Sequence, residues 1–464
     1  MENKSSLKIN IMRVFSANFI ATIVGFASSF IFPKILTIDA YAIYHTYTLY
    51  LGYIAILHLG FPSGMVINYA GKSYSDINKK QYKSELILLL LILIFFTGTF
   101  LVFNMVQPSS MIVLVALSII PVCWVGSYKA LVQAWDEFKA YTRISIFVSV
   151  AVPVLAILYY VLRKDLPGNV YILIYLCVYT ITTIYLLAST AKDLISVKSA
   201  KIFSNYNFQT EKTGAIVAVG SYINTLFASA DKQFVSWFFT NAEFAYYSFA
   251  MSMQSIMSVL ITSIAQPLFP AMAQGKFADE EYDDVKNIFC IFGSFSGCAY
   301  FAISIIVKLF IPKYIDSLSV AALYFSVFPA MAVIQCLYIN LYKIKGKIKT
   351  YVLTLLSVLG VAVGLNLFMI KTFGKFTGIA IATVATYYIW MLIGVYQFKF
   401  IKFKLKELMF LGAYFMAYFS CTRYLNDVIG FFVYAGIMIL IALIFYRKLI
   451  MKYVASTIKG IRGV

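Results

Sequence analysis

Stretches of about 20 apolar residues recur along the whole of this 464-residue chain. Each stretch is long enough to cross the hydrocarbon core of a bilayer, which is about 30 Å thick. Hydrophobic residues make up 62% of the sequence and charged residues only 12%, whereas soluble domains contain roughly 45–50% apolar residues. No segment between the apolar stretches is long enough for a soluble domain. The sequence therefore predicts an all-α integral membrane protein.

The apolar stretches predict about fourteen transmembrane helices. The first is too long for a signal-peptide core and has no small-residue cleavage site after it, so we expect it to be retained. Two predicted spans are weak, because residues 41–60 contain His45 and His58 and residues 405–423 are short. The predicted spans are 10–34, 41–60, 85–106, 111–135, 142–162, 170–190, 215–239, 245–273, 286–311, 318–342, 350–371, 378–398, 405–423 and 429–447.

The distribution of lysine and arginine predicts the orientation in the membrane. About 29 of these residues lie at the two termini and in alternate loops, whereas the other loops hold about 8. Cytoplasmic loops carry the excess of basic residues, so we expect both termini in the cytoplasm. The net charge of +19 is spread over short loops and does not gather on one soluble face. It therefore indicates a membrane protein and not a nucleic-acid-binding protein.

The widest gap between predicted spans is polar and basic, and it divides the chain after six spans. The segment LTIDAYAIY before this gap matches FTNAEFAYY after it, at an offset of about 203 residues. An even number of spans makes such repeats parallel, with a binding site expected between them near the bilayer midplane. We expect an N-terminal lobe at 1–190, a cytoplasmic linker at 191–214, a C-terminal lobe at 215–398, and two additional helices with a basic tail at 399–464.

Two adjacent charged residues, Asp231 and Lys232, lie within the seventh predicted span. An ionisable residue there costs at least a few kcal/mol, so it is expected to face a water-filled cavity or a partner. Asn224 and Asp231 adjoin a stripe of small and polar residues at helical spacing, formed by Ser221, Thr225, Ala228, Lys232 and Ser236. The stripe predicts a polar side of this helix along which a solute could pass. A salt bridge that only fixes helix packing is the alternative for either charge.

Several features together resemble a known family. They are the opening segment FSANFIATIVGFASSFIFPKILTIDAYAIYHTY, the Asp231–Lys232 pair, Phe269–Pro270 in the eighth span, and the six-plus-six layout. In these features the chain resembles the polysaccharide flippases, the Wzx-type exporters of O-antigen and capsule, within the multidrug/oligosaccharidyl-lipid/polysaccharide exporter superfamily. The usual family member has twelve spans, and fourteen is common in the related lipid II flippases.

The resemblance implies a two-lobed bundle that works by alternating access. Its cargo would be an undecaprenyl-diphosphate-linked oligosaccharide, an O-antigen or capsule repeat unit, moved from the inner to the outer leaflet of the bacterial cytoplasmic membrane. It further implies contact with membrane lipids and the polysaccharide polymerase machinery, no cofactor, and a monomer as the default state. Coupling to H⁺ or Na⁺ stays open. A cation-coupled multidrug antiporter of the same superfamily and a lipid II-type flippase are the alternatives.

Further polar residues are candidates for binding this cargo. Ser252, Gln254 and Ser255 form a second polar stripe on the eighth span, where hydroxyls can equally join helices together. The basic residues Arg13, Lys34, Lys129 and Lys308 could receive the diphosphate, and the alternative is that they anchor or snorkel at the interface. Lys232 is the first candidate for the anionic group. Asp231 and His58 are the candidates for ion coupling, each with a structural role as the alternative.

Catalytic chemistry finds no support in the sequence. It contains no phosphate loop, no HExxH motif and no nucleophile elbow. The six cysteines show neither metal-binding spacing nor a disulfide framework, and we expect them to pack as small apolar residues. A membrane glycosyl polymerase or ligase would need a large external loop, and every external loop here is short. We therefore expect a transporter and not an enzyme, with no metal site and no nucleic-acid partner.

Overall fold

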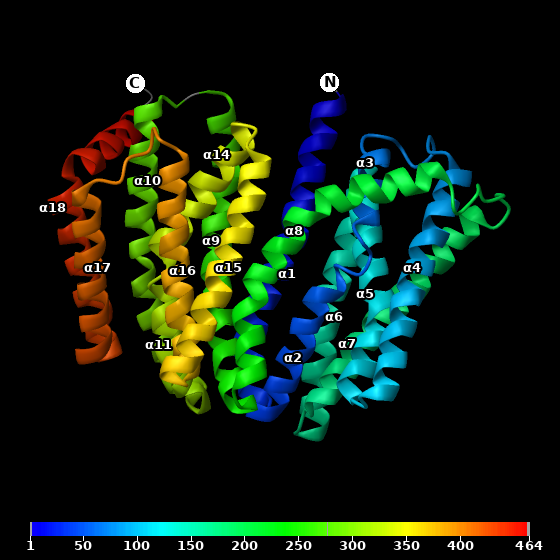
Figure 1. The fold of residues 1–464 in the computed structure, drawn as a ribbon, viewed down its shortest axis with the longest axis horizontal. Coiled ribbons are helices and arrows are strands. Elements are labelled where there is room, and N and C mark those ends of the chain that lie inside the picture. Colours follow the sequence, from blue (N-terminus) through cyan, green and yellow to red (C-terminus); the bar gives the residue numbers. More distant parts are fainter. Residues whose placement is uncertain (1, 276, 462–464) are drawn as a thin grey trace. The chain divides into compact units, whose positions relative to one another are not determined.

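A computed structural model of the protein describes residues 2–275 and 277–461, and every regular element within them is helical (Figure 1). This confirms the predicted all-α class. The helices are α1 (Glu2–Ile35), α2 (Ile38–Ile54), α3 (Phe61–Tyr69), α4 (Lys79–Val106), α5 (Ser110–Ala134), α6 (Phe138–Arg163), α7 (Gly168–Leu194), α8 (Asn205–Phe238), α9 (Asn241–Ala273), α10 (Asp279–Ser294), α11 (Ser296–Phe310), η1 (Pro312–Ser317), α12 (Leu318–Phe325), α13 (Phe328–Val333), η2 (Ile334–Tyr338), α14 (Ile339–Ile344), α15 (Ile348–Phe373), α16 (Phe376–Gln397), α17 (Leu405–Tyr424) and α18 (Asp427–Ile461).

Every predicted membrane span falls on one or more of these helices. Within the described residues, eleven helices are long and apolar enough to cross a membrane, and the bent pair Pro312–Phe325 and Phe328–Ile344 makes a twelfth. The other two predicted spans fall on α2, with 17 residues, and on α17, with 20. Neither is among the twelve, and both belong to the segments that the sequence marks as weak. The chain is a multi-pass membrane protein.

The segment expected to be a linker, 191–214, includes the end of α7 and the start of α8. Helix α7 continues to Leu194 and α8 begins at Asn205, which leaves only residues 195–204 outside regular helix. The Asn207 side chain is fully buried and donates hydrogen bonds to the Ile202 carbonyl (2.7 Å) and to Ser84 Oγ (3.3 Å). These contacts hold the first turn of α8 against α4. Apolar periodicity does not reveal buried polar contacts of this kind.

The predicted span at 318–342 is broken. Its two parts meet at an angle of 47°, and a π-helical turn, η2, interrupts the second part. Pro329 lies in the first turn of α13, where its missing N–H leaves no intrahelical bond unmade. Gly293 lies against this break, because a Cβ atom there would be 2.4 Å from the carbonyl oxygen of Phe328. The preceding predicted span, 286–311, is divided at Phe295 into α10 and α11.

The structure divides into two compact units, residues 1–229 and 230–464, with the boundary inside α8. In unit 1, α5 packs against α2, α3, α4 and α7, around buried Trp124, Tyr82 and Leu89. In unit 2, α15 packs against α16, α10 against α13, and α18 against both α11 and α17. The lobe boundaries expected at 190 and 215 stay a prediction.

Candidate functional site

A buried carboxylate, Asp231 on α8, accepts hydrogen bonds from three helices of unit 2. Thr383 Oγ1 on α16 lies 2.5 Å from Asp231 Oδ2, Asn366 Nδ2 on α15 lies 3.0 Å from Oδ1, and Tyr324 Oη on α12 lies 3.3 Å from Oδ2. Asp231 is only 9% exposed. All of these partners are neutral, and no described basic side chain forms an ion pair with Asp231. Hydrogen bonds alone therefore compensate for the burial of this acid.

The surrounding residues hold the three donors in place. Tyr247 on α9 is fully buried, and its hydroxyl lies 2.7 Å from that of Tyr324, so that a chain of hydroxyls leads to Asp231. Thr383 Oγ1 also lies 3.0 Å from the carbonyl oxygen of Ile379, one turn earlier on α16. The side-chain oxygen of Asn366 has no hydrogen-bond partner among the described residues. A second buried oxygen acceptor is thus present in the cluster formed by Asp231, Tyr324, Asn366 and Thr383, called here the Asp231 cluster.

The two neighbours predicted with Asp231 differ in burial. Lys232 follows it on α8 and is half-buried, and side chains one residue apart on a helix point about 100° away from each other. Asn224 is exposed. Sequence analysis predicted Asp231 as a site residue but not its hydrogen-bond donors, although Asn366 and Thr383 are polar residues within predicted spans. Which polar residues converge in space depends on how α8, α12, α15 and α16 pack.

The second polar stripe, on α9, uses its hydroxyls locally. Ser252 Oγ donates to the carbonyl of Ser248 and Ser255 Oγ to that of Met251, each at 2.9 Å within α9. Gln254 is buried and its Nε2 lies 3.9 Å from the sulfur of Met331. Bonds to the preceding turn satisfy a Ser hydroxyl without any ligand. A role of these residues in cargo binding stays a prediction.

Two of the predicted cationic residues have specific neighbours. Lys308, at the end of α11, forms an ion pair of 2.7 Å with Asp427, at the start of α18. Its side chain is still 48% exposed, so the pair lies at the surface. Lys129 on α5 lies with its Nζ 5.4 Å from the centre of the Tyr141 ring. The Lys308 pair ties α11 to α18, which is the structural alternative for this residue.

The remaining candidates lie in unit 1. Arg13 and Lys34, both on α1, are exposed. His58 follows α2 and is half-buried; its Nδ1 accepts a hydrogen bond from the Gly60 N–H (3.2 Å) and lies 3.4 Å from Tyr222 Oη. Gly60 has a φ of +81° and ends this turn before α3. The contacts of His58 fit a structural role at the break between α2 and α3.

A second buried acid, Glu85 on α4, was not predicted. It is fully buried in unit 1 and accepts a hydrogen bond from the Tyr69 hydroxyl on α3, while Thr210 Oγ1 on α8 lies 3.4 Å from it. Asn68 Nδ2 in turn lies 2.9 Å from Thr210 Oγ1. Glu85 is the first residue of a predicted span, where an acid resembles an ordinary interfacial residue. The contacts that bury it come from segments distant in the sequence.

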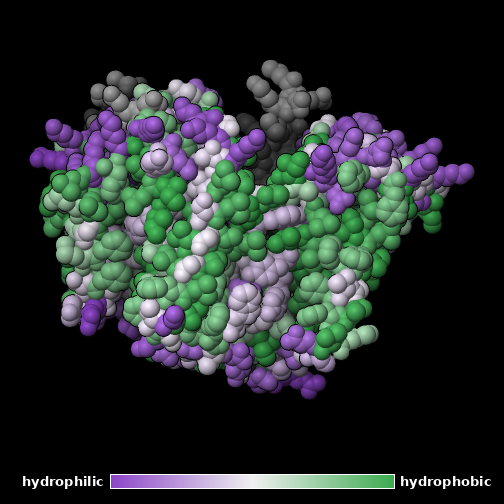
Figure 2. All heavy atoms as spheres, viewed as in Figure 1, coloured by the Kyte–Doolittle hydropathy of each residue, from purple (hydrophilic) through white to green (hydrophobic). Residues whose placement is uncertain are grey.

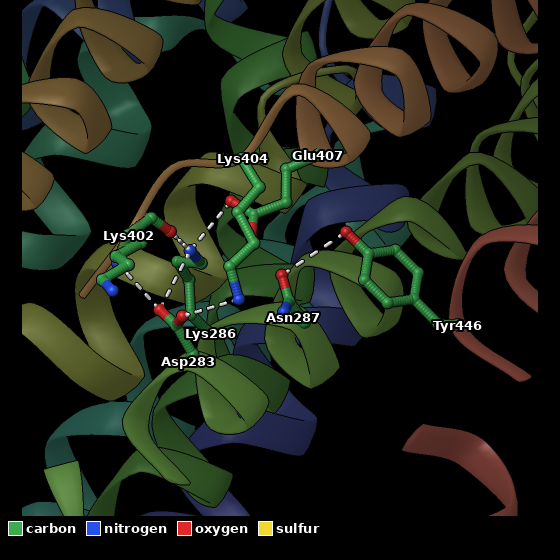
Figure 3. Close-up of polar contacts among 7 residues, drawn as sticks. All are labelled: Asp283, Lys286, Asn287, Lys402, Lys404, Glu407 and Tyr446. Atoms are coloured by element: carbon green, nitrogen blue, oxygen red, sulfur yellow. Dashed lines mark hydrogen bonds and ion pairs between the residues drawn. The ribbon is translucent and has the colours of Figure 1, made fainter. Parts of the chain in front are cut away.

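A buried ion pair in unit 2 was also not predicted (Figure 3). Lys286 on α10 and Glu407 on α17 are 2% and 4% exposed, and Lys286 Nζ lies 2.8 Å from Glu407 Oε2. Lys286 also donates to the carbonyl of Lys402 and lies 3.4 Å from Asp283 Oδ1. Asp283 accepts from the Lys402 N–H (2.9 Å) and pairs with Lys404 (3.3 Å). These five residues are called the Lys286 cluster.

The comparisons with known proteins agree with this architecture. A sequence model of the family described as "Polysaccharide biosynthesis protein" matches residues 7–276, more than half of the chain. This chain belongs to the polysaccharide biosynthesis protein family. The matched region includes α2 to α9 and the Asp231–Lys232 pair. The predicted membership in a family of polysaccharide flippases is thereby confirmed.

A solved structure has the same fold. The "Lipid II flippase MurJ, inward closed conformation" aligns with a TM-score of 0.64 at 15% identity, covering 95% of this chain and 100% of that chain. At this identity the likeness establishes a shared fold and nothing finer. No curated protein matches the chain. The polysaccharide biosynthesis family and the shared fold are those of flippases and transporters.

Proposed function

We propose that this protein moves an undecaprenyl-diphosphate-linked oligosaccharide, an O-antigen or capsule repeat unit, from the inner to the outer leaflet of the bacterial cytoplasmic membrane. The family match over residues 7–276 carries this proposal. The transport mechanism is alternating access, with both termini in the cytoplasm. The chain acts as a monomer beside the polysaccharide polymerase machinery.

The composition suits such a cargo. A lipid-linked oligosaccharide combines a sugar head, a diphosphate and a long lipid tail. The chain has 36 tyrosines, whose rings stack on sugars while their hydroxyls form hydrogen bonds, and 38 lysines and arginines, which attract the diphosphate. Lysine and arginine exceed the 19 acidic residues twofold, which favours an anionic cargo over an organic cation.

Within this mechanism, Lys232 binds the anionic part of the cargo and Asp231 couples transport to an ion. Two buried oxygen-bearing groups, the carboxylate of Asp231 and the side-chain carbonyl of Asn366, lie in one cluster with neutral donors. Such an oxygen-rich site can take either a proton or a hard cation such as Na⁺. Because its partners are neutral, the charge of Asp231 is free to change with occupancy.

Export of surface glycan in a deletion strain tests the function. Loss of surface glycan with lipid-linked oligosaccharide accumulating on the cytoplasmic side supports the proposal. Unchanged lipid intermediates with altered dye efflux would instead identify a multidrug antiporter. Failure of cell-wall synthesis, with lipid II accumulating, would identify a lipid II flippase.

Complementation with variants tests the residue roles. We expect Lys232→Ala and Asp231→Asn each to lower export at least roughly tenfold, equivalent to about 1.4 kcal/mol in the barrier. Lys232→Arg retains the positive charge and should keep most of the activity. The matched control is Lys192→Ala, at an exposed lysine near the end of α7. Normal export by membrane-inserted Lys232→Ala would remove the cargo-binding role, and normal Na⁺ and pH dependence of Asp231→Asn would remove the coupling role.

A further inference from the structure

A cavity of about 540 Å³ lies between α10, α17 and α18, at the end of unit 2 that carries the last turns of α18. Five of the side chains that line it are cationic: Lys404, Lys406, Arg447, Lys448 and Lys452. They come from the start of α17, including its N-cap Lys404, and from α18. They are brought together because these two helices pack side by side (Figure 1). This cavity, lined by these five cations, is called the basic cavity.

The acids near the basic cavity neutralise only part of its charge. Asp284 pairs with Lys452 at 2.8 Å, and Asp283 pairs with Lys404 at 3.3 Å. Glu407 also lines the cavity, but its carboxylate is already paired with Lys286 at 2.8 Å. The three remaining cations, Lys406, Arg447 and Lys448, have no carboxylate partner within the described residues. The basic cavity therefore keeps an excess of positive charge.

Contacts with neighbouring residues fix the positions of several of these cations. The Lys286 cluster ties residues 402–404 to α10 through hydrogen bonds and an ion pair, and it ties Glu407 to α10 through a buried ion pair (Figure 3). Lys406 Nζ lies 4.7 Å from the centre of the Tyr446 ring, and Tyr446 Oη lies 3.4 Å from Asn287 Oδ1. Tyr446 also marks a bend in α18, with a φ of −130° and a ψ of 24°. The bend starts at the residue directly before Arg447 and Lys448, so the cavity is shaped by the backbone as well as by side chains.

The basic cavity borders an apolar surface. Ile444 lines the cavity and is 76% exposed. Leu440 on α18, one turn before Ile444, and Met409 on α17 are also exposed. Figure 2 shows hydrophilic side chains gathered at this end of unit 2, directly beside hydrophobic surface. A free phosphate needs only the cations, whereas a phospholipid uses the cations for its head and the apolar surface for its acyl chains.

We propose that the basic cavity binds the phosphate of an anionic phospholipid, with the acyl chains lying along α17 and α18. Basic pockets between membrane helices are suited to anionic head groups, and ionised donors form the stronger hydrogen bonds to phosphate oxygens. The site is separate from the Asp231 cluster and does not depend on the proposed cargo. Binding of the lipid would fasten α17 and α18 to α10.

Binding of phosphatidylglycerol to the purified full-length protein tests the proposal, with native mass spectrometry in a neutral detergent. The test variant is Lys406→Gln/Arg447→Gln/Lys448→Gln. The matched control, Lys192→Gln/Lys198→Gln/Lys201→Gln, removes the same charge from exposed lysines of unit 1. We expect the test variant to bind phosphatidylglycerol roughly tenfold or more weakly, and the control to bind like the wild type.

A charge-preserving variant separates charge loss from misfolding. Lys406→Arg/Arg447→Lys/Lys448→Arg should retain binding, and all variants should elute as folded protein on size exclusion. Phosphatidylcholine should bind no better to the wild type than to the test variant. Equal losses in the test and control variants would overturn the proposal in favour of unspecific charge attraction. Displacement of the lipid by millimolar inorganic phosphate would contradict the phospholipid proposal and identify a free-phosphate site. Preference for undecaprenyl diphosphate over phosphatidylglycerol would also contradict it and identify a cargo-binding site.

Discussion

Replacing Lys286 by Met should destabilise unit 2 strongly, because it leaves a buried acid without its counter-ion. Glu407 is 4% exposed, and Lys286 is its ion-pair partner among the described residues. Removing one partner of a buried pair costs about 3–5 kcal/mol. Asp283 is less affected, because it keeps Lys404 at 3.3 Å and the Lys402 N–H at 2.9 Å. The loss therefore concentrates on Glu407.

The double variant Lys286→Met/Glu407→Leu separates the charge from the packing. It removes the unpaired carboxylate. Its remaining defect is that the Lys402 carbonyl loses its hydrogen-bond donor, which costs about 1–3 kcal/mol in the free energy of unfolding. Thermal unfolding in detergent, followed by tryptophan fluorescence, should show Lys286→Met melting roughly 10 °C below wild type, at about 2–4 °C per kcal/mol for a unit of this size. The double variant should recover a clear part of this loss.

The exposed partner supplies the control. Lys404 pairs with Asp283, but its side chain is 59% exposed, so Lys404→Met should cost under about 1 kcal/mol. Equal melting temperatures for Lys286→Met and the double variant would refute the reasoning, since the unpaired carboxylate would then not be the cause. A loss for Lys404→Met as large as for Lys286→Met would refute it too.

Three further changes test other contacts. Gly214→Ala should lower the free energy of unfolding by about 1–3 kcal/mol, because the new Cβ would lie 2.2 Å from a backbone oxygen. Gly220→Ala on the same helix is the control, because its Cβ would meet nothing within 4 Å. Melting curves of the two variants measure the difference. Glu85→Ala should cost about 1–3 kcal/mol by leaving buried donors unpaired, and Glu85→Gln should cost less, as measured by the same unfolding assay. Tyr434→Phe removes a buried hydrogen bond to the Ser294 carbonyl and should cost about 1 kcal/mol, visible as a melting shift of a few degrees.

Much of the membrane fold follows from the sequence. Each membrane span must satisfy its backbone hydrogen bonds within its own helix and expose apolar side chains to lipid, so it is visible as a run of apolar residues. The exceptions have identifiable causes. Helix α8 extends beyond the predicted span 215–239 to Asn205. Asn207 and Thr210 in this extension are buried against α4 and α3, although polar side chains signal a loop in a hydropathy profile. The break between α12 and α13 depends on Pro329 and on how Gly293 packs against it.

The candidate site was predictable only in part. The high cost of charge in lipid drew attention to Asp231, and the structure places it in a polar cluster of unit 2. Its donors Tyr324, Asn366 and Thr383 are separated from it by 93 to 152 positions. No local pattern shows that three such residues converge. The same limit applies to Lys286, the first residue of the predicted span 286–311, and to Glu407, in the first turn of α17. Both resemble interfacial residues in the sequence.

The two buried acids of unit 2 differ in a way that bears on their roles. Glu407 faces an ammonium group at 2.8 Å, which compensates its negative charge, and the ion pair joins α10 to α17. Among the described residues, Asp231 accepts hydrogen bonds only from hydroxyl and amide donors, which stabilise a carboxylate without a compensating charge. A proton or a cation can supply that charge, and its arrival or departure would change the forces between α8, α12, α15 and α16. The proposed coupling role of Asp231 therefore predicts movement among these helices, whereas the ion pair of Lys286 and Glu407 is expected to hold α10 and α17 together.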